Sequence, residues 1–490
     1  MPQHPAFTVM ERSPLPPNAL PMLLPSRWRP ALLALALVAG LPARAEVLDL
    51  SAVEKAPVAP GKPFAPRTLP DRIVLTPGAD PSREMAVSWR TDASQPTAEA
   101  EITALKPAPN FGLGARRVTG DSMTTTSENG AAVFHRARFT GLTPGTAYAY
   151  RVKGAAGWSE WHQFTTAASA REPFRFIYLG DTQNSILSLG SLAWRRALLA
   201  ANNPALMLHA GDLVDQRDDL VPDDEWGEWN AAGGWALAAL PQLVAAGNHE
   251  YVMRGGVREL GRHWPLQFAL PENGAPGVGR TSYTLDWQGV RFIVLDGTSA
   301  LELGTLEAQT AWLEAQLKRP RLDWTVVTFH QPIFTCARPN DTPQLKEAWV
   351  PLFERHGVDL VLQGHDHCFS RLTAAEGREA SARARKAGRP QGLVYLVSVA
   401  GSKQYGLNDR SGIQPDRVAE DSMLYQLVEV ERTRLTLKAF TADGRLYDGF
   451  TLTRGRDGRN RLTEVAPLPA ERRCRDGRNA DGFPCTARKR

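Results

Sequence analysis

The chain lacks an apolar run long enough to cross a membrane comfortably. Its clearest apolar stretch, residues 31–45, reads ALLALALVAGLPARA and is shorter than the roughly 20 residues that a transmembrane helix needs. Arg27 and Arg29 precede this stretch and Ala43-Arg44-Ala45 ends it, which is the pattern of a secretory signal with an A-x-A cleavage site. We therefore predict a signal peptide over residues 1–45 and a secreted or periplasmic protein, with an uncleaved anchor as the alternative.

Cysteine is also scarce, with four in 490 residues, and no sequence motif places any of them among metal ligands. An exported chain enters a compartment where disulfides persist. Cys474 and Cys485 enclose a short loop rich in Gly, Asn and Asp, so we predict that they pair. Cys336 and Cys368 either approach each other or remain two separate buried thiols.

A basic face is not evident in the body of the chain. The formal net charge is +5, but residues 451–490 contain 11 Lys+Arg against 5 Asp+Glu, and residues 1–45 contain 4 against 1. Residues 46–450 therefore carry a net charge of −4. Binding to nucleic acid through a basic surface is not expected.

The length exceeds what one hydrophobic core usually supports, so two domains are expected. Residues 46–70 are rich in Pro and Ala without a hydrophobic period, which predicts a linker. Residues 71–167 contain short alternating segments typical of an all-β sandwich. Beyond residue 453 no packable pattern is present, and residues 454–490 are predicted to be a basic, disordered tail.

Between residues 172 and 453 the pattern changes to strands that alternate with helices. Five apolar runs each lead directly into a short polar block: residues 174–179, 205–210, 243–246, 324–329 and 358–363. The carboxyl ends of strands are where α/β sheets place their ligands. We expect an α/β domain whose polar blocks meet at one edge.

These blocks supply carboxylate, amide and imidazole groups. They read Gly180-Asp181-Thr182-Gln183, Gly211-Asp212-Leu213-Val214-Asp215, Gly247-Asn248-His249-Glu250, His330, and Gly364-His365-Asp366-His367. A pair of cations about 3.5–4 Å apart needs a carboxylate that bridges both, and Asp212 is the natural bridge. Asp181 and His367 then complete one metal site. Asn248, His330 and His365 complete the other.

In order and residue type, the blocks resemble those of the calcineurin-like metallophosphoesterases, most of all the purple acid phosphatase branch. The resemblance covers roughly residues 174–440, and the preceding stretch is similar to the N-terminal domain of that branch. It implies a four-layer sandwich of two mixed β-sheets flanked by helices, preceded by an all-β fibronectin type III-like sandwich. The metal ligands that it implies are Asp181, Asp212, Asn248, His330, His365 and His367.

Two positions depart from the pattern of these families. Residue 215 is aspartate where purple acid phosphatases have an iron-binding tyrosine, so the colour of a tyrosinate–iron complex is not expected. Asp215 either replaces that ligand or orients another one. Gln183 occupies the position of the superfamily's first-block histidine, where an amide oxygen is a poor substitute, so it is a candidate ligand or a neighbour of one.

Catalytic and substrate-binding roles follow less directly. The resemblance assigns assistance to the leaving group to His249, alongside the bridging Asp212. Four further residues are candidates for contact with the substrate: Arg338, Glu250, His263 and Arg371. Each also has an ordinary structural explanation, such as a solvated arginine, an orienting partner, a buried histidine or a cap on a sheet edge.

The leading hypothesis is an exported phosphatase of acid-phosphatase type that hydrolyses phosphate monoesters with two metal ions, Fe, Zn or Mn. A phosphodiesterase acting on nucleotides or phospholipid head groups is the alternative, because the same scaffold serves both reactions. A non-catalytic binding protein with a vestigial site is a third reading, against which the complete ligand set argues. The expected partner is a small phosphate ester, with neither nucleic acid nor a stable membrane span.

Overall fold

The computed structural model describes residues 62–215, 223–373, 393–408, 415–456, 458 and 460–486. Every described residue belongs to one compact unit of the chain. The predicted signal peptide and most of the predicted linker lie outside the described residues. Within the described ranges, no helix combines the length and the apolarity that a membrane crossing requires.

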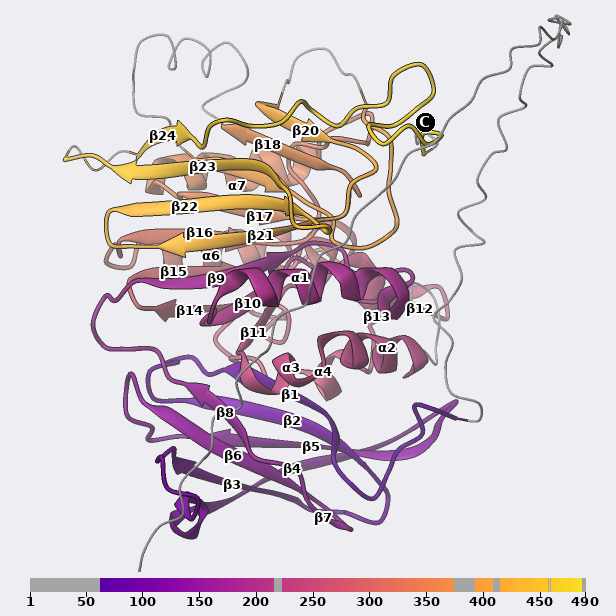
Figure 1. Ribbon diagram of the computed structural model, residues 1–490, viewed down its shortest axis with the longest axis vertical. Helices are drawn as coiled ribbons and strands as arrows, with labels where there is room; N and C mark the ends of the chain where they lie inside the picture. Colours follow the sequence, from indigo (N-terminus) through magenta and orange to yellow (C-terminus); the bar gives the residue numbers. More distant parts are fainter. Residues whose placement is uncertain are drawn as a thin grey trace, which may run out of the picture. The chain divides into compact units, whose positions relative to one another are not determined.

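An all-antiparallel β domain comes first (Figure 1). Its strands are β1 (Asp71–Pro77), β2 (Met85–Asp92), β3 (Ala98–Ala104), β4 (Arg116–Ser127), β5 (Gly130–Phe139), β6 (Ala147–Gly154), β7 (Gly157–Trp158) and β8 (His162–Thr165). Residues 116–120 of β4 pair with β3, and residues 121–127 pair with β5, so this strand joins the two halves of the sandwich. At the change of partner, a Cβ on Gly120 would lie 1.7 Å from the Arg136 carbonyl oxygen, which only glycine avoids.

The second domain contains two mixed sheets, as the sequence predicts. The first sheet has the order β11-β10-β9-β21-β22-β23-β24, in which β9, β10 and β11 are parallel and the remaining pairs are antiparallel. Its strands are β9 (Phe174–Leu179), β10 (Leu206–His209), β11 (Gln242–Val244), β21 (Leu424–Val430), β22 (Arg434–Thr441), β23 (Leu446–Arg454) and β24 (Asn460–Glu464).

The second sheet has the order β14-β15-β16-β17-β19-β18-β20, with β15, β16, β17 and β19 parallel. Its strands are β14 (Tyr283–Trp287), β15 (Val290–Val294), β16 (Trp324–Thr328), β17 (Leu360–Gln363), β18 (Phe369–Thr373), β19 (Val394–Val397) and β20 (Arg417–Ala419). A separate hairpin pairs β12 (Tyr251–Arg254) with β13 (Val257–Leu260). Phe176, Phe292 and Leu362 belong to one buried cluster, so the two large sheets share a core.

Helices complete the layers of this domain. α1 (Ser191–Ala201) packs on β9 and β21 of the first sheet, and its buried side chains include Trp194 and Ala197. On the second sheet, α6 (Leu306–Leu317) and α7 (Pro343–His356) bury Leu313 and Trp349 in a cluster with Val327. The remaining helices are α2 (Asp223–Gly233), α3 (Trp235–Ala239), α4 (Trp264–Gln267) and α5 (Gly297–Glu302), with short turns η2 (Phe111–Gly114), η3 (Ile186–Gly190) and η4 (Asn248–Glu250). The predicted order of helix, sheet, sheet and helix is present.

The C-terminal segment differs from the prediction. The predicted disorder beyond residue 453 is wrong for the described part, because β24 extends the first sheet by pairing with β23. Further along, Cys474 and Cys485 form the predicted disulfide. Glu420 fixes this segment by accepting a hydrogen bond from the Cys474 backbone nitrogen. Unpaired donors and acceptors along the edge of β23 explain why a segment of low apolar content becomes ordered.

One buried ionic cluster joins the two domains. The Asp223 carboxylate lies 2.5 Å from Arg72 Nη1 and 3.0 Å from Arg90 Nη1, and Asn129 Nδ2 donates to it at 3.0 Å. Arg72, Arg90 and Asn129 come from the β domain, whereas Asp223 opens α2. A shared buried carboxylate with several charged partners therefore holds strands and helix together.

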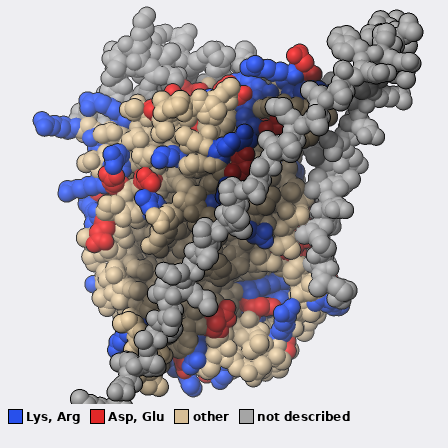
Figure 2. Space-filling model, in the orientation of Figure 1, with Lys and Arg blue, Asp and Glu red and all other residues tan. Residues whose placement is uncertain are grey.

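On the face that Figure 2 shows, basic and acidic side chains are interspersed among other residues. This distribution agrees with the near-balance of charge in residues 46–450.

Candidate metal centre

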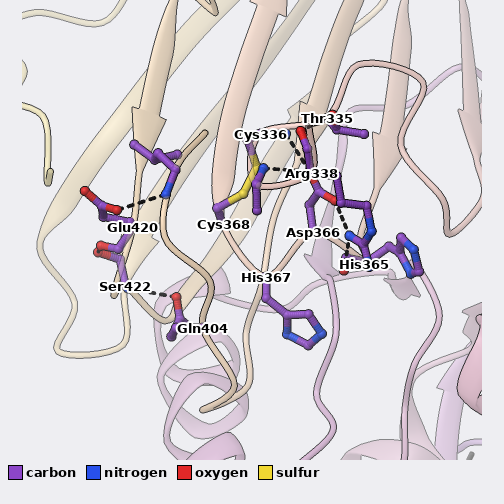
Figure 3. The surroundings of a disulfide bond; sticks show 12 residues. Thr335, Cys336, Arg338, His365, Asp366, His367, Cys368, Gln404, Glu420 and Ser422 are labelled. Atoms are coloured by element: carbon purple, nitrogen blue, oxygen red, sulfur yellow. Dashed lines mark hydrogen bonds and ion pairs between the residues drawn. A yellow bond between two sulfur atoms is a disulfide. The ribbon is translucent and has the colours of Figure 1, made fainter. Parts of the chain in front are cut away.

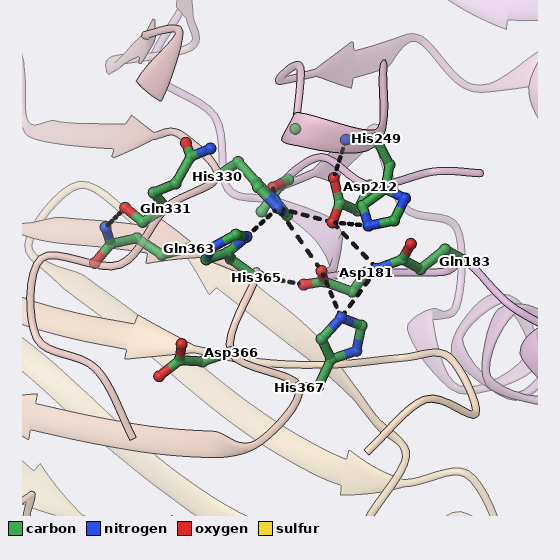
Figure 4. A network of polar contacts seen from close by, with 12 residues as sticks. Asp181, Gln183, Asp212, His249, His330, Gln331, Gln363, His365, Asp366 and His367 are labelled. Carbon is green, nitrogen blue, oxygen red and sulfur yellow. Dashed lines mark hydrogen bonds and ion pairs between the residues drawn. The ribbon is translucent and has the colours of Figure 1, made fainter. Parts of the chain in front are cut away.

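The polar blocks lie where the parallel strands of the two sheets end. Asp181 follows β9, Asp212 follows β10, and Asn248 comes a few residues after β11. In the second sheet, His330 and His365 follow the parallel neighbours β16 and β17. Because these carboxyl ends converge, side chains that are far apart in the sequence meet in space (Figure 4).

Two groups of ligand atoms result, and they share Asp212. The ligand atoms of Asp181, Asp212 and His367 all lie within 4.8 Å of one another, as do those of Asp212, His330 and His365. Asp212 Oδ2 lies 3.0 Å from His330 Nε2, and Asp181 Oδ1 lies 3.8 Å from His367 Nε2. The structure thus brings five of the six predicted ligands into two candidate sites with one carboxylate in common.

The sixth predicted ligand, Asn248, lies on the wall of the same pocket as Asp212 and His365. Its side chain is buried, and Asn248 Oδ1 has no hydrogen-bond partner among the described residues. Asp181 Oδ1 is also buried without a hydrogen-bond partner among the described residues. A buried polar oxygen without a partner is costly, which indicates that these atoms are built to meet a ligand.

Backbone conformation at the ligands is unusual. Asp181, Asp212, His365 and His367 all have positive φ, at 27°, 49°, 72° and 49° respectively. Each such conformation costs a non-glycine residue on the order of 1–2 kcal/mol, and such residues cluster at functional sites. The tight turns aim the side chains back across the ends of the strands.

Two glycines leave room for the carboxylates. A Cβ on Gly247 would lie 2.1 Å from Asp212 Oδ1, and a Cβ on Gly364 would lie 2.2 Å from Asp181 Oδ2. The glycines of the Gly-Asn-His-Glu and Gly-His-Asp-His blocks are therefore required by the close approach of neighbouring loops.

Hydrogen bonds to backbone carbonyls orient two of the imidazoles. His330 Nδ1 donates to the Ala210 carbonyl oxygen at 2.8 Å, and His367 Nδ1 donates to the Lys403 carbonyl oxygen at 2.9 Å. Since a carbonyl oxygen only accepts, Nδ1 carries the proton in both rings. In the neutral form of each ring, Nε2 then presents a lone pair to the centre, as metal-binding histidines do.

The electrostatics of the centre also fit cations. Burial opposes protonation of His330, but the Asp212 and Asp181 carboxylates raise its pKa to about 9. Burial raises the pKa of Asp181 well above its usual range. Protons are thus drawn to the positions that metal ions would take, and a donor set of carboxylate, imidazole and amide oxygen suits Fe, Zn or Mn.

Gln183 adjoins the Asp181 side of the centre and is fully buried. Its Nε2 lies 2.9 Å from His367 Nε2 and 3.1 Å from Asp212 Oδ2, while Oε1 has no partner among the described residues. The amide therefore touches two ligands of one candidate site. Its place fits either of the roles that the sequence allows, ligand or neighbour.

His249 lies above Asp212 and points into the pocket. Its backbone nitrogen donates to Asp212 Oδ1 at 2.9 Å, and its Nδ1 lies 3.4 Å from Asp215 Oδ1. Nε2 lies 3.8 Å from Asp212 Oδ2. Asp215 thus faces the imidazole of His249 without a hydrogen bond, and the two roles that the sequence allows for it, ligand or orienting group, stay predictions.

The ligand groups open on a pocket of about 170 Å³. Its walls are formed by Asp212, Asn248, His249, Arg338, His365, His367, Lys403 and Tyr405. Sequence analysis missed Lys403 and Tyr405, which lie in the loop after β19. The position of that loop was the available signal, because β19 is parallel to β17 and its carboxyl end faces the same edge.

Arg338, a candidate for contact with the substrate, does line this pocket. Its Nη1 donates to the His365 carbonyl oxygen at 3.0 Å and pairs with the buried Asp366 carboxylate. Asp366 also accepts hydrogen bonds from the backbone nitrogens of Cys336 and Ala337. The Cys336–Cys368 disulfide, whose pairing the sequence left open, joins the same two loops (Figure 3).

The three other candidates for contact with the substrate, Glu250, His263 and Arg371, do not line this pocket. Glu250 is buried and accepts hydrogen bonds from the backbone nitrogens of Gly247, Asp212 and Leu213, so it shapes the loop of Asp212 instead. His263 is buried at the junction of the domains, with Nε2 3.3 Å from Asp223 Oδ1. Proximity in the sequence to the third block did not bring it to the pocket.

Arg371 is likewise not in the pocket. Its guanidinium is 1% exposed and pairs with Asp448 at 2.7 Å and with Glu464 at 3.0 Å. These bonds connect β18 of the second sheet to β23 and β24 of the first. The role of Arg371 is to balance charge inside the sandwich.

Comparison with known proteins agrees with this fold. Residues 70–166 match the purple acid phosphatase N-terminal domain, and residues 174–369 match the calcineurin-like phosphoesterase family. The chain is a calcineurin-like metallophosphoesterase that carries a purple acid phosphatase N-terminal domain.

Among related proteins, the uncharacterized protein Rv2577 of Mycobacterium tuberculosis is 29% identical over 334 residues, which cover 61% of each chain. Purple acid phosphatase 15 of Arabidopsis thaliana is 24% identical over 54% of this chain and 53% of its own. The chain thus spans less than two thirds of the length of these relatives. The solved structure of purple acid phosphatase PPD1 from yellow lupin (Lupinus luteus) seeds has the same fold, with a TM-score of 0.63, 17% identity, and coverage of 80% of this chain and 75% of that one.

Proposed function

We propose that the protein is an exported phosphatase that hydrolyses phosphate monoesters at a centre of two metal ions. The observation that carries the proposal is the pair of ligand groups sharing Asp212, with buried oxygens of Asp181 and Asn248 that lack partners. In this proposal Asp181, Asp212 and His367 hold one ion. Asp212, Asn248, His330 and His365 hold the other.

The chemistry that two metal ions supply at such a centre is a nucleophile made from water and neutralisation of charge on the phosphoryl oxygens. Glu250 accepts hydrogen bonds from the backbone nitrogens of Asp212 and Leu213, which fix the turn that carries the shared carboxylate. The Ala210 and Lys403 carbonyl oxygens hold the rings of His330 and His367. The protein thus presents a rigid set of ligands before the substrate arrives.

His249 is placed to donate a proton to the leaving group. Its ring lines the pocket outside both ligand groups, and Asp215 Oδ1 lies 3.4 Å from its Nδ1, close enough to stabilise the protonated ring. A positioned acid of this kind contributes about 10²–10⁴-fold to the rate. Arg338 adds a guanidinium to the wall of the same pocket.

The proposal is tested with protein loaded with Fe, Zn or Mn, by measuring metal content together with hydrolysis of p-nitrophenyl phosphate and bis(p-nitrophenyl) phosphate. We expect two ions per chain and faster turnover of the monoester. A strong preference for the diester would replace the monoesterase by a phosphodiesterase. Correctly folded, fully loaded protein that hydrolyses neither ester would favour a binding protein.

Location in an oxidising compartment is part of the proposal. It is supported by two disulfides, Cys336–Cys368 and Cys474–Cys485, since such bonds persist mainly outside the cytosol. Fusing residues 1–45 to a reporter enzyme that is active only after export tests this location. Retention of the reporter inside the cell would contradict it.

A further inference from the structure

We propose that the pocket selects phosphate monoesters that carry a second anionic group, a carboxylate or another phosphate, and that Lys403 and Arg338 contact this group. The inference rests on the proposed function, in which the metal centre takes the reacting phosphate. The inference adds the chemical class of substrate that the pocket prefers. Neither residue belongs to the ligand groups or to the pair of His249 and Asp215.

Lys403 places an ammonium group on the pocket wall. Its side chain is 27% exposed, and Nζ lies 3.6 Å from Asp215 Oδ1, which is an ion-pair distance without a hydrogen bond. Within the described part of the chain, Nζ donates no hydrogen bond. An ammonium group has three donors, so all three are available to a ligand.

Arg338 presents a second cation from another loop. Only Nη1 is engaged, by the His365 carbonyl oxygen and by Asp366. Nε and Nη2 donate no hydrogen bond to the described residues, and the side chain is 27% exposed. A guanidinium held on one side offers its remaining donors as a fork for a carboxylate or phosphate.

The loop that carries Lys403, residues 401–408, is attached to neighbouring loops by several hydrogen bonds. Tyr405 N donates to the His367 carbonyl oxygen at 2.9 Å, and Asn408 N donates to that of Cys336 at 2.8 Å. Leu407 N donates to Glu420, and Gln404 Oε1 accepts from Ser422 N at 3.0 Å (Figure 3). The backbone of Lys403 is therefore held in place while its ammonium group stays available.

The cations on the pocket wall are not needed to balance the charge of the reacting phosphate. Two divalent ions against the carboxylates of Asp181 and Asp212 leave about two positive charges, which a phosphate dianion balances. Lys403 and Arg338 come in addition, on the wall beyond the ligands. Asp215 and Asp366 balance their formal charge, but they leave most of the donors of Lys403 and Arg338 without a hydrogen bond within the described residues. These donors, on the pocket wall, are what a second anionic group would contact.

The test compares matched substrates with the metal-loaded full chain. The carboxylate arm pairs 3-phosphoglycerate with glycerol 3-phosphate, and the phosphate arm pairs fructose 1,6-bisphosphate with fructose 6-phosphate. We expect kcat/KM to favour the doubly anionic substrate about tenfold or more in at least one arm, as a charged hydrogen bond would give. The arm that shows the preference identifies the second group.

Variants link the preference to the two cations. Lys403→Met and Arg338→Met should each reduce the ratio of kcat/KM values toward one, and Lys403→Arg should keep most of it. Lys318→Met, at the exposed residue that follows α6, should keep all of it. In titration calorimetry, wild-type protein should bind pyrophosphate at least tenfold more tightly than phosphate, and Lys403→Met should lose this difference with unchanged metal content. If Arg338→Met loses metal, Lys403→Met carries the test.

A ratio near one in both arms of the wild type would overturn the inference. So would a preference that survives both methionine substitutions at full metal content. Failure of the proposed function looks different, because fully loaded protein would then hydrolyse none of the four substrates.

Discussion

Two buried clusters of charged side chains in this protein differ in whether their carboxylates have permanently charged partners. At the junction of the domains, the Asp223 carboxylate is matched by Arg72 and Arg90 and by an amide from Asn129. At the metal centre, the side chains that pair with Asp181 and Asp212 are histidines. Burial is nearly complete in both places, at 2% exposure for Asp223 and 1% for Asp181 and Asp212.

The difference shows how a structural cluster can be told from a ligand site. Permanent cations from arginine complete the first cluster, which then needs nothing more. The second combines positive φ at four ligand residues with buried oxygens that have no partner. Strain and missing partners in the same few residues indicate a site that a ligand completes.

The largest effect is expected from Asp212→Asn, which removes the shared charge and keeps the shape. We expect kcat/KM for p-nitrophenyl phosphate to fall at least about 10³-fold, because the loss of bridged metal removes several kcal/mol of transition-state stabilisation. Elemental analysis should show fewer than two ions per chain. Full turnover or two retained ions would contradict the assignment.

The matched change in the other cluster is Asp223→Asn. It leaves two buried arginines without their shared carboxylate, so the free energy of unfolding should fall by about 3–5 kcal/mol. Denaturant titration measures this loss, and metal content per folded chain should stay at two. Lys318→Met, which breaks an exposed pair with Glu314, serves as the control and should change stability by less than about 1 kcal/mol.

His249→Gln separates proton donation from metal binding. We expect kcat for phenyl phosphate to fall about 10²-fold, because its leaving group needs a proton. The fall should be smaller for p-nitrophenyl phosphate, whose leaving group departs as a stable anion. Metal content is the control and should stay unchanged. An equal fall in kcat for both esters would contradict the role of His249 as a proton donor.

The smallest expected effect is the pH dependence of the stability that Asp223 contributes at the junction of the domains. Burial opposes ionisation of Asp223, but His263, Arg72 and Arg90 together hold its pKa below its usual range. An unfolded aspartate titrates near about pH 3.9, so below this pH the unfolded chain binds more protons than the folded one, and stability falls as pH falls.

The contribution of Asp223 is therefore present above about pH 4 and is lost toward the lower pKa of the folded protein, by about 1 kcal/mol per pH unit. Urea titrations of metal-free protein between pH 5 and pH 3 should show a steeper loss in wild type than in Asp223→Asn. Parallel curves would show that Asp223 does not contribute to the acid sensitivity.

The candidate site was predictable in its ligands and less so in its surroundings. Asp181, Asp212, His330 and His365 follow buried strands, and that local pattern carries both the chemistry and the position. Lys403 lies in the loop after β19, but no motif marks it. His263 and Arg371, which the sequence offers as possible contacts beside structural alternatives, do not line the pocket, because nearness in the sequence to a ligand block does not determine the direction of a side chain.

By itself, the sequence determined that strands alternate with helices and that polar blocks follow the strands, because hydrophobic period and residue type at strand ends are local properties. The two mixed sheets and the set of six ligands were implied by the resemblance to a known family. Only the tertiary structure decided which buried charges are already paired. Asp223 meets Arg72 across 151 positions of the chain, and Lys403 reaches the pocket because a loop is tied to His367 and Cys336. Pairing of charges depends on which segments pack together, and no short stretch of sequence contains that information.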